Sequence, residues 1–509
     1  MPSRAIKPKK DDEPVSGKGW QGLAEQAPSL VRPEQPTTAR VVALVGLFPL
    51  VLGAAALFCY LIEKPYLISL SWGIVLFVLG VGALLYHAFV EKDLQYRRLY
   101  GAVGAAALGL AVVFLLVPAK VPGAERQTDP DKQTEARTEM GALFLPGGAP
   151  CLLLAIGFLG AFARNETDQK LRRMTLGVIG VAGVLTALLG LAGGALSDNF
   201  MLGKGVVLLA VGLLYLGAYI GLEGAGSDSG HLAGLGIGLL GGLMLAVALA
   251  FSFGPYLLYW LNLSDALPSQ PFFMPRGLLL LYFGLEYVLL SLAICSDNRL
   301  VVLTRRELAA FFYSPIAYVL LIGVTVLGWC FFREFIDALL DPRRPVGVPE
   351  PIVRFFTTDY FQVFSVVFIV PLLTMRLLSE ERRTGSLEVL LTAPVNETPV
   401  VLSKFFAALR VFLLIWYSWG FFLLALRVEG GEEFDYRPLL TFFISLSFMG
   451  AGWLAMGLFF SSLTRNQIAS AIMTLVAMIV LTMIFWFKRG LPEGTVWFNV
   501  LQYVSYVDL

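Results

Sequence analysis

The feature that most constrains this chain is a series of long apolar runs, which recur from about residue 41 to residue 487. A helix needs about 20 such residues to cross the roughly 30 Å hydrocarbon core of a bilayer. Hydrophobic residues make up 57% of the chain and charged residues 15%. The sequence therefore predicts an all-α, polytopic helical integral membrane protein, and it excludes a soluble globular enzyme, a disordered chain and a disulfide scaffold.

We expect about thirteen transmembrane helices, separated by polar turns and loops. Their approximate limits are 41–62, 67–89, 99–118, 141–163, 174–196, 205–222, 231–253, 276–296, 313–332, 360–378, 402–426, 438–460 and 467–487. The first eight are rich in Gly, Ala and Leu, whereas the later ones are richer in Phe, Trp and Met. This change in composition places a boundary near 297–304, between an N-terminal region at 41–296 and a second region.

The polar segment 1–40 cannot bury a core, so we expect a disordered tail. It carries seven Lys or Arg residues, which by the positive-inside rule favour a cytoplasmic N-terminus in a multi-pass cell (inner, or cytoplasmic) membrane protein. Alternating from this tail, the segment 376–405 also lies in the cytoplasm. The bias is small, because the remaining Lys and Arg residues divide evenly between the two sides.

Two rows of glycine in the N-terminal region predict close helix packing. Gly234, Gly238 and Gly242 recur every fourth residue, and Gly177, Gly180 and Gly183 every third. Small residues at this spacing let neighbouring helix backbones approach closely. A sliding or gating surface is the alternative interpretation.

Glu286 is the acidic residue of greatest interest in this region, because it falls in the middle of the apolar run 276–296. A charged carboxylate near the centre of a bilayer costs several kcal/mol unless it is protonated or paired. Glu286 is therefore either a functional group facing other helices or water, or a neutral, hydrogen-bonded packing residue.

The second region opens with a segment, 304–321, whose pattern predicts a short amphipathic helix at the membrane interface, followed by a bend into the bilayer. Its charged residues precede aromatic ones, and a proline comes just before the next apolar run. The residues concerned are Arg305, Arg306, Glu307, Phe311, Phe312 and Pro315.

The loop 376–405 predicts a second amphipathic helix, held outside the membrane between two spans. A charged cluster is followed by a Gly-Ser pair, then by leucines on one helical face, and then by a proline that ends the helix. An apolar face of this kind requires a partner groove, with a solvated charged loop as the alternative. The residues are Glu380, Glu381, Arg382, Arg383, Gly385, Ser386, Leu387, Glu388, Leu390, Leu391 and Pro394.

Together with the polar turn in 459–471, these segments resemble the membrane subunits of ABC-2 type transporters, in particular the gliding-motility-type bacterial permeases. The resemblance covers about residues 304–509 and depends most on EERRTGSLEVLLTAPV (380–395) followed by Lys404. It implies that Glu381, Gly385, Ser386, Glu388, Leu390, Leu391 and Pro394 form an element that docks on an ATPase, and that 304–313 is a connector helix at the cytoplasmic face.

The resemblance also implies two permeases, identical or related, paired with two ATP-binding-cassette ATPase subunits. No GxxxxGK[ST] phosphate loop occurs in the sequence, so ATP hydrolysis is expected on a separate chain. The chain departs from the family in two ways. We count five spans in this module where the family usually has six, and eight spans of unknown role precede it.

Arg410 lies about two turns inside the span that follows the loop 376–405. Its side chain can reach the cytoplasmic surface, or it can pair with a carboxylate on a neighbouring helix. Glu286 is a candidate partner, although the expected depths of the two residues differ.

Two other functions remain open: an ion- or proton-coupled carrier that uses Glu286, and a non-transporting scaffold for motility or envelope assembly. A membrane-embedded enzyme is disfavoured, because two histidines and four isolated cysteines offer no nucleophile–base pair or metal cluster. We therefore expect no catalytic residue, cofactor or metal, and with a net charge of +1 we expect no nucleic-acid partner. The lipid bilayer is the expected environment, and the transported substrate cannot be read from the sequence.

Overall fold

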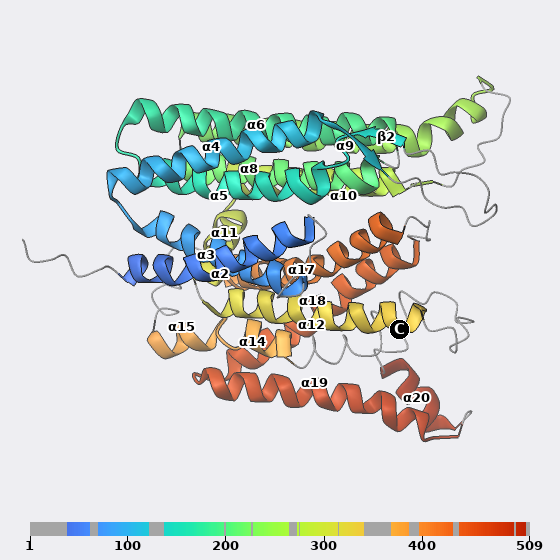
Figure 1. The fold of residues 1–509 in the computed structure, drawn as a ribbon. Helices are drawn as coiled ribbons and strands as arrows, with labels where there is room; N and C mark the ends of the chain where they lie inside the picture. The colour runs from blue at the N-terminus through green and yellow to red at the C-terminus, as the bar shows by residue number, and fades with distance from the viewer. Residues whose placement is uncertain are drawn as a thin grey trace, which may run out of the picture. The chain divides into compact units, whose positions relative to one another are not determined.

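A computed structural model of the chain describes residues 38–61, 70–121, 137–197, 200–224, 227–263, 272–273, 275–313, 315–340, 368–385, 397–430, 437–492 and 495–504. This part of the chain is almost entirely helical (Figure 1). It also contains the π-helical turns η1 (Phe144–Gly148) and η2 (Met201–Gly205), and one short antiparallel pair, β1 (Pro118–Val121) with β2 (Arg137–Met140).

Ten helices in the described part are long and apolar enough to cross a membrane, which confirms the predicted all-α polytopic membrane fold. They are α2 (Thr38–Leu61), α3 (Leu70–Val90), α4 (Leu94–Leu116), α5 (Ala149–Asn165), α6 (Gln169–Leu196), α8 (Val206–Glu223), α9 (Asp228–Trp260), α10 (Pro275–Cys295), α17 (Glu397–Gly430) and α18 (Arg437–Leu463).

The expected count of thirteen spans stays a prediction. The expected span 313–332 lies largely within helix α12 (Pro315–Leu340), and 467–487 lies within α19 (Gln467–Arg489), whose apolar part is shorter. Most of 360–378 lies outside the described residues. The other helices are α11 (Arg299–Tyr313), α14 (Val370–Thr374), α15 (Ser379–Thr384) and α20 (Val496–Val504).

The chain divides into two compact units, one formed by residues 1–104 and 157–167 and the other by 105–156 and 168–509. In the first unit, α2 packs so closely on α3 that a Cβ atom built on Gly53 would lie 2.3 Å from the backbone nitrogen of Phe77. At the polar end of this unit, Arg97 forms an ion pair with Glu166 at 3.3 Å. Its Nη1 atom also donates to the carbonyl of Asn165 at 2.7 Å.

The second unit contains two hydrophobic cores. The first is formed by α6, η2, α8, α9 and α10, which lie side by side (Figure 1). Tyr287 of α10 is fully buried in this core and donates a hydrogen bond to the carbonyl of Leu209 in α8 at 2.9 Å. The hydroxyl group is thus satisfied inside the helix bundle, as a buried phenol requires.

The glycine row of α9 follows a different register from the predicted one. Gly234 and Gly238 face α10 as expected, but a Cβ atom built on Gly242 would have no neighbour within 4 Å. The third close approach is made by Gly241, where a Cβ atom would lie 2.8 Å from the carbonyl oxygen of Gly284. An α-helix has 3.6 residues per turn, so Gly242, eight positions after Gly234, no longer lies on the same helical face. Gly241, seven positions after Gly234, does lie on that face.

The row on α6 shows a similar drift. Gly180 and Gly183 face α8, where a Cβ atom would lie 3.2 Å from the Tyr219 ring and 2.9 Å from Leu216, respectively. Gly177 has open space at the corresponding position. Glycine therefore serves helix packing at two of the three predicted positions in each row.

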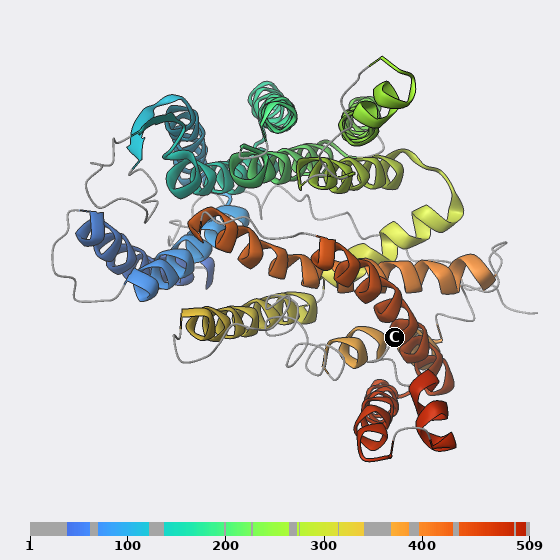
Figure 2. The same cartoon turned by 90° about the vertical axis from the view of Figure 1, so that its right-hand side faces the viewer.

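The second core is formed by α12, α14, α17, α18 and α19, and it includes the fully buried Phe412 and Trp416 of α17. Its residues all follow residue 307, whereas those of the first core all precede residue 295. Helix α17 also lies against α11, as both views of the ribbon show (Figures 1 and 2). This helix carries two of the site residues predicted from the sequence, Lys404 and Arg410.

Candidate functional site

Helix α11 contains the segment expected to form the connector helix, but it begins earlier than predicted. The expected range is 304–313, whereas α11 spans Arg299–Tyr313. Asn298 explains the earlier start, because its Oδ1 atom accepts a hydrogen bond from the Leu300 backbone N–H at 2.9 Å. An asparagine side chain satisfies a free amide at a helix N-terminus in this way.

The two faces of α11 have different environments. Leu308 and Phe311 pack against the second hydrophobic core. On the polar side, Arg305 donates from Nη1 to the carbonyls of Ala293 and Ile294 at 3.3 and 3.4 Å, which places a cation at the last carbonyls of α10.

Three further connector residues are placed as follows. Arg306 is exposed and lies 3.3 Å from the carboxylate of its neighbour Glu307. Phe312 is half-buried near the end of α11, and Pro315 is the first residue of α12. A proline fits the first turn of a helix because the N–H that it lacks would have no intrahelical partner there.

At the start of the loop 376–405, the chain forms the short helix α15, which is capped at its C-terminal end by Gly385 with φ of +74°. A glycine adopts this left-handed conformation without steric cost. At the other end of α15, the backbone N–H groups of Leu378 and Ser379 both donate to Oγ of Ser461 at 3.1 Å. Ser461 belongs to α18 and is fully buried.

Ser461 is not among the site residues predicted from the sequence. The sequence offers only the polar turn in 459–471 as a signal, and nothing in it indicates which hydroxyl group faces which helix. The contact attaches the start of α15 to α18.

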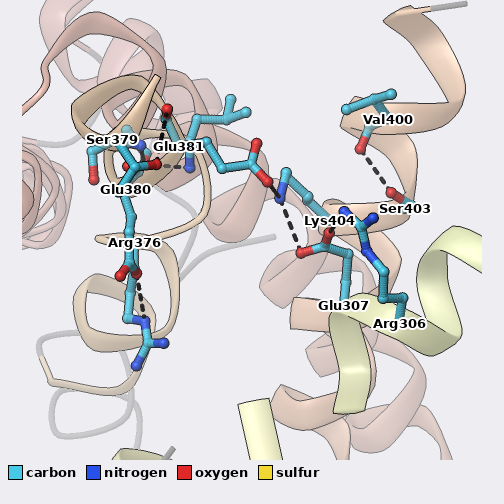
Figure 3. Close-up of polar contacts among 12 residues, drawn as sticks. Arg306, Glu307, Arg376, Ser379, Glu380, Glu381, Val400, Ser403 and Lys404 are labelled. Carbon is cyan, nitrogen blue, oxygen red and sulfur yellow. Dashed lines mark hydrogen bonds and ion pairs between the residues drawn. The ribbon is translucent and has the colours of Figure 1, made fainter. Parts of the chain in front are cut away.

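Lys404 of α17 joins α15 and α11 through two ion pairs (Figure 3). Its Nζ atom lies 2.7 Å from Oε1 of Glu381 in α15 and 2.9 Å from Oε2 of Glu307 in α11. The lysine side chain is 2% exposed, and the two carboxylates are 18% and 14% exposed. We refer to Glu307, Glu381 and Lys404 as the Lys404 cluster.

The electrostatics of the Lys404 cluster follow from this burial. Removing an ion from water costs several kcal/mol, so a buried ammonium requires close carboxylates and hydrogen bonds. Two carboxylates against one ammonium leave an excess negative charge, which the exposed guanidinium of Arg306 beside Glu307 offsets. The cluster thus holds Glu307 and Glu381, which lie 97 and 23 positions before Lys404 in the sequence, against the first turns of α17.

Three other predicted residues in the described part of the loop 376–405 do not join this cluster. Glu380 forms an ion pair with Arg376 one turn earlier, at 3.3 Å. Arg382 and Arg383 are exposed. The other predicted positions, Ser386, Glu388, Leu390, Leu391 and Pro394, lie outside the described residues, so their amphipathic helix stays a prediction.

Glu286 and Arg410 come together within the apolar part of the second unit. Arg410 donates from Nη1 to Oε1 of Glu286 at 2.9 Å, and its Nη2 atom contacts the other carboxylate oxygen. Tyr417 donates to the same Oε1 atom at 3.2 Å, and its ring packs edge-on against Tyr282 at 5.5 Å. We refer to Tyr282, Glu286, Arg410 and Tyr417 as the α10–α17 polar cluster.

The difference in depth expected for Glu286 and Arg410 does not keep them apart. Helix α17 begins at Glu397, five residues before the expected span, so about 20 Å of helix precedes Arg410. Glu286 is 5% exposed and fully engaged by two donors.

No group of three or more His, Cys, Asp or Glu residues in the described part of the chain is arranged to hold a metal ion. What the structure does present is a set of apolar helices in which the buried Lys404 and Glu286 pair with charged side chains of other helices. These features define a multi-pass helical membrane protein.

Comparison with known families gives a match within the second region. Residues 348–506 match the family described as ABC-2 family transporter protein. This match supports a permease component of an ABC transporter, a transport subunit rather than an enzyme. No curated protein and no solved structure matches the chain.

Proposed function

We propose that this chain is the membrane-spanning permease subunit of an ATP-binding-cassette exporter, coupled to a separate ATPase chain through the cytoplasmic loop 376–405. The observation that carries this proposal is the Lys404 cluster, which attaches the first part of the loop to α17 and α11. The match to the ABC-2 family over residues 348–506 gives independent support.

The geometry provides a mechanical route from the loop to the membrane. Force applied to the loop reaches α15, which is held by Ser461 of α18 and by Lys404 of α17. Moving α15 alone would separate Glu381 from a buried ammonium, which is energetically costly. The loop, α11 and the start of α17 therefore move together when an ATPase subunit pushes or pulls on the loop.

The exporter proposal includes two permease copies or two related permeases for each pair of ATPases, in the cell membrane with a cytoplasmic N-terminus. One ATPase dimer presents two docking grooves, so each coupling loop is expected to occupy one groove. The alternative, a motility or envelope scaffold, differs in that ATP hydrolysis would be dispensable.

Copurification tests the proposal directly. The tagged full chain, solubilised in mild detergent, is expected to retain an ATPase with a phosphate-binding loop. Leu391→Asp should abolish this retention, because it places a charge on the predicted apolar docking face. Glu334→Gln serves as the control, since Glu334 is an exposed residue of α12 and is not part of the loop sequence.

Absence of any such ATPase from the wild-type preparation would overturn the proposal. Equal retention by wild type and Leu391→Asp would also overturn it, provided that both chains elute as folded particles.

A further inference from the structure

The α10–α17 polar cluster connects the region that matches the transporter family to the helices that precede it. Arg410 and Tyr417 lie on α17, seven residues and hence about two turns apart, on one face. Tyr282 and Glu286 lie on α10, four residues apart, again on one face. Two matched helical faces thus meet through an ion pair, a hydrogen bond and a ring contact.

Helix α17 carries both polar clusters, on different sides. Lys404 and Arg410 are six residues apart, which is about 9 Å along the helix and about 240° around it. Lys404 faces α11 and α15, whereas Arg410 faces α10. A displacement of α17 that begins at the coupling loop therefore has to pass along less than two turns of α17 before it acts on α10.

The helix α10 is in turn tightly packed into the first hydrophobic core. Its Gly284 carbonyl meets the Gly241 position of α9, and its Ser291 side chain meets the Gly238 position. Tyr287 donates to Leu209 of α8 at 2.9 Å. These close contacts make α8, α9 and α10 one packed body, so a force on Glu286 acts on all three helices.

The apolar surroundings make the link between α10 and α17 difficult to break. The Glu286 side chain is 6% exposed and the Arg410 side chain 35%, and Arg410 lies within an apolar span. Separating the two ions would leave two unpaired charges inside the membrane. The free energy of an unpaired charge there is too high for a movement that recurs in every transport cycle. Movement of α17 is therefore expected to carry α10 with it rather than to dissociate the pair.

We propose that the N-terminal membrane helices α8, α9 and α10 act as a driven part of the transporter, joined to the coupling helix α17 by Glu286. This inference rests on the proposed function, because the ATPase supplies the movement. Glu286 is a positioning residue in this scheme: it acts on the first core by holding α10 against Arg410. The resemblance to the family assigns no role to these helices.

Two reporter positions test the inference in the full chain bound to its ATPase. The native cysteines are replaced by alanine, and a spin label is attached either to Phe406→Cys on α17 or to Leu239→Cys on α9. Both side chains are exposed. We expect trapping of the ATPase in its ATP-bound state to change the spectra at both positions.

Variants at the polar cluster then separate a coupling role from a purely structural one. Glu286→Gln should leave the response at position 406 and weaken the response at position 239, where the contact of Arg305 with α10 still transmits part of the movement. Glu286→Leu with Arg410→Leu removes both charges without leaving an unpaired ion, so the protein should fold and its response at 239 should also be weaker than in wild type. The exchange Glu286→Arg with Arg410→Glu should restore the full response at position 239. The control variant Glu334→Gln should leave the responses at both positions unchanged.

The outcomes distinguish the two proposals. No response at position 406 in the presence of bound nucleotide would contradict the proposed coupling loop itself. In the wild-type background, a response at 406 without one at 239 would overturn the role of Glu286. An undiminished response at 239 after loss of both charges in a folded protein would do the same, and either result would leave the exporter assignment intact.

Discussion

Lys404 illustrates how one side chain can hold three segments of a membrane protein together. Its ammonium lies between Glu381 and Glu307, and it is almost completely buried. Removing this charge leaves two carboxylates facing each other with little access to water. Removing one partner of a buried ion pair lowers the stability of the fold by about 3–5 kcal/mol, because the remaining charge is left buried without a partner. This loss is larger than the stability that the intact pair adds over well-packed apolar residues.

We therefore predict that Lys404→Met releases α15 and the coupling loop. The exposed Arg382 and Arg383 are convenient reporters, because trypsin cleaves after them only when the segment can unfold locally. Cleavage of the purified chain at this site should become faster than in wild type, and thermal unfolding should begin at a lower temperature.

A triple variant provides the control for this prediction. Glu307→Gln and Glu381→Gln, combined with Lys404→Met, remove every charge of the cluster and should recover part of the lost stability. Equal cleavage of wild type and Lys404→Met would show that the cluster does not hold the loop.

A second residue-scale prediction concerns Glu91 in the first unit. The Arg40 guanidinium donates to its carboxylate at 2.7 and 3.3 Å, and this hydrogen bonding holds the pKa of Glu91 below its usual value. A lowered pKa in the folded state adds stability at pH values above the unfolded-state pKa. That contribution is lost as the pH falls through the folded-state pKa.

Glu91→Gln should therefore lower stability by about 1 kcal/mol at neutral pH, as is usual for a partly exposed ion pair. The difference from wild type should shrink to nothing once the pH is below the folded-state pKa. Unfolding temperatures of the two proteins, measured from pH 7 down to acid, check this, and a difference that is independent of pH would contradict it.

At the scale of elements, the helix pair α9–α10 shows where the sequence is informative and where it is not. Gly234, Gly238 and Gly242 satisfy a simple spacing rule, yet the structure uses Gly241 for the third contact. The choice depends on the crossing of the two helix axes, which is set by α10 and not by α9 alone.

Neighbouring glycines on α9 therefore give a matched test. Gly241→Ala should destabilise the protein, because its Cβ atom would lie 2.8 Å from the Gly284 carbonyl and 2.9 Å from Tyr287. Overpacking of this kind costs about 1–3 kcal/mol. Gly242→Ala has open space and should be neutral or stabilising, by up to about 1 kcal/mol.

Thermal unfolding of the two single variants in the same detergent measures the difference. If both substitutions had the same effect, the register of α9 against α10 would have to differ from that in the structure.

The all-α membrane fold was predictable because apolar runs of span length follow from the thickness of the bilayer. The charged residues of the loop and of α11 were also identified, since their types and spacing stand out in an apolar chain. Which of them meet was not predictable, because Glu307, Glu381 and Lys404 are distant in the sequence and nothing local determines their pairing. Ser461 was missed for the same reason.

At the scale of the whole molecule, the Lys404 cluster constrains the orientation of the chain in the membrane. It brings the middle of α11, the helix α15 and the start of α17 together, so all three lie on one side. Helix α12 follows α11 directly and has 26 residues, a length of about 39 Å, enough to cross the bilayer core. Glu334 near its far end should therefore lie on the opposite side from Arg383.

Labelling from one side of the membrane tests this orientation. In a background without the native cysteines, Glu334→Cys in intact cells should react with a membrane-impermeant maleimide, whereas Arg383→Cys should react only after the cells are permeabilised. Both positions are exposed in the structure, so different reactivity would report sidedness and not burial. Labelling of Arg383→Cys from outside would place the coupling loop away from ATP, and no cytoplasmic ATPase could then act on it.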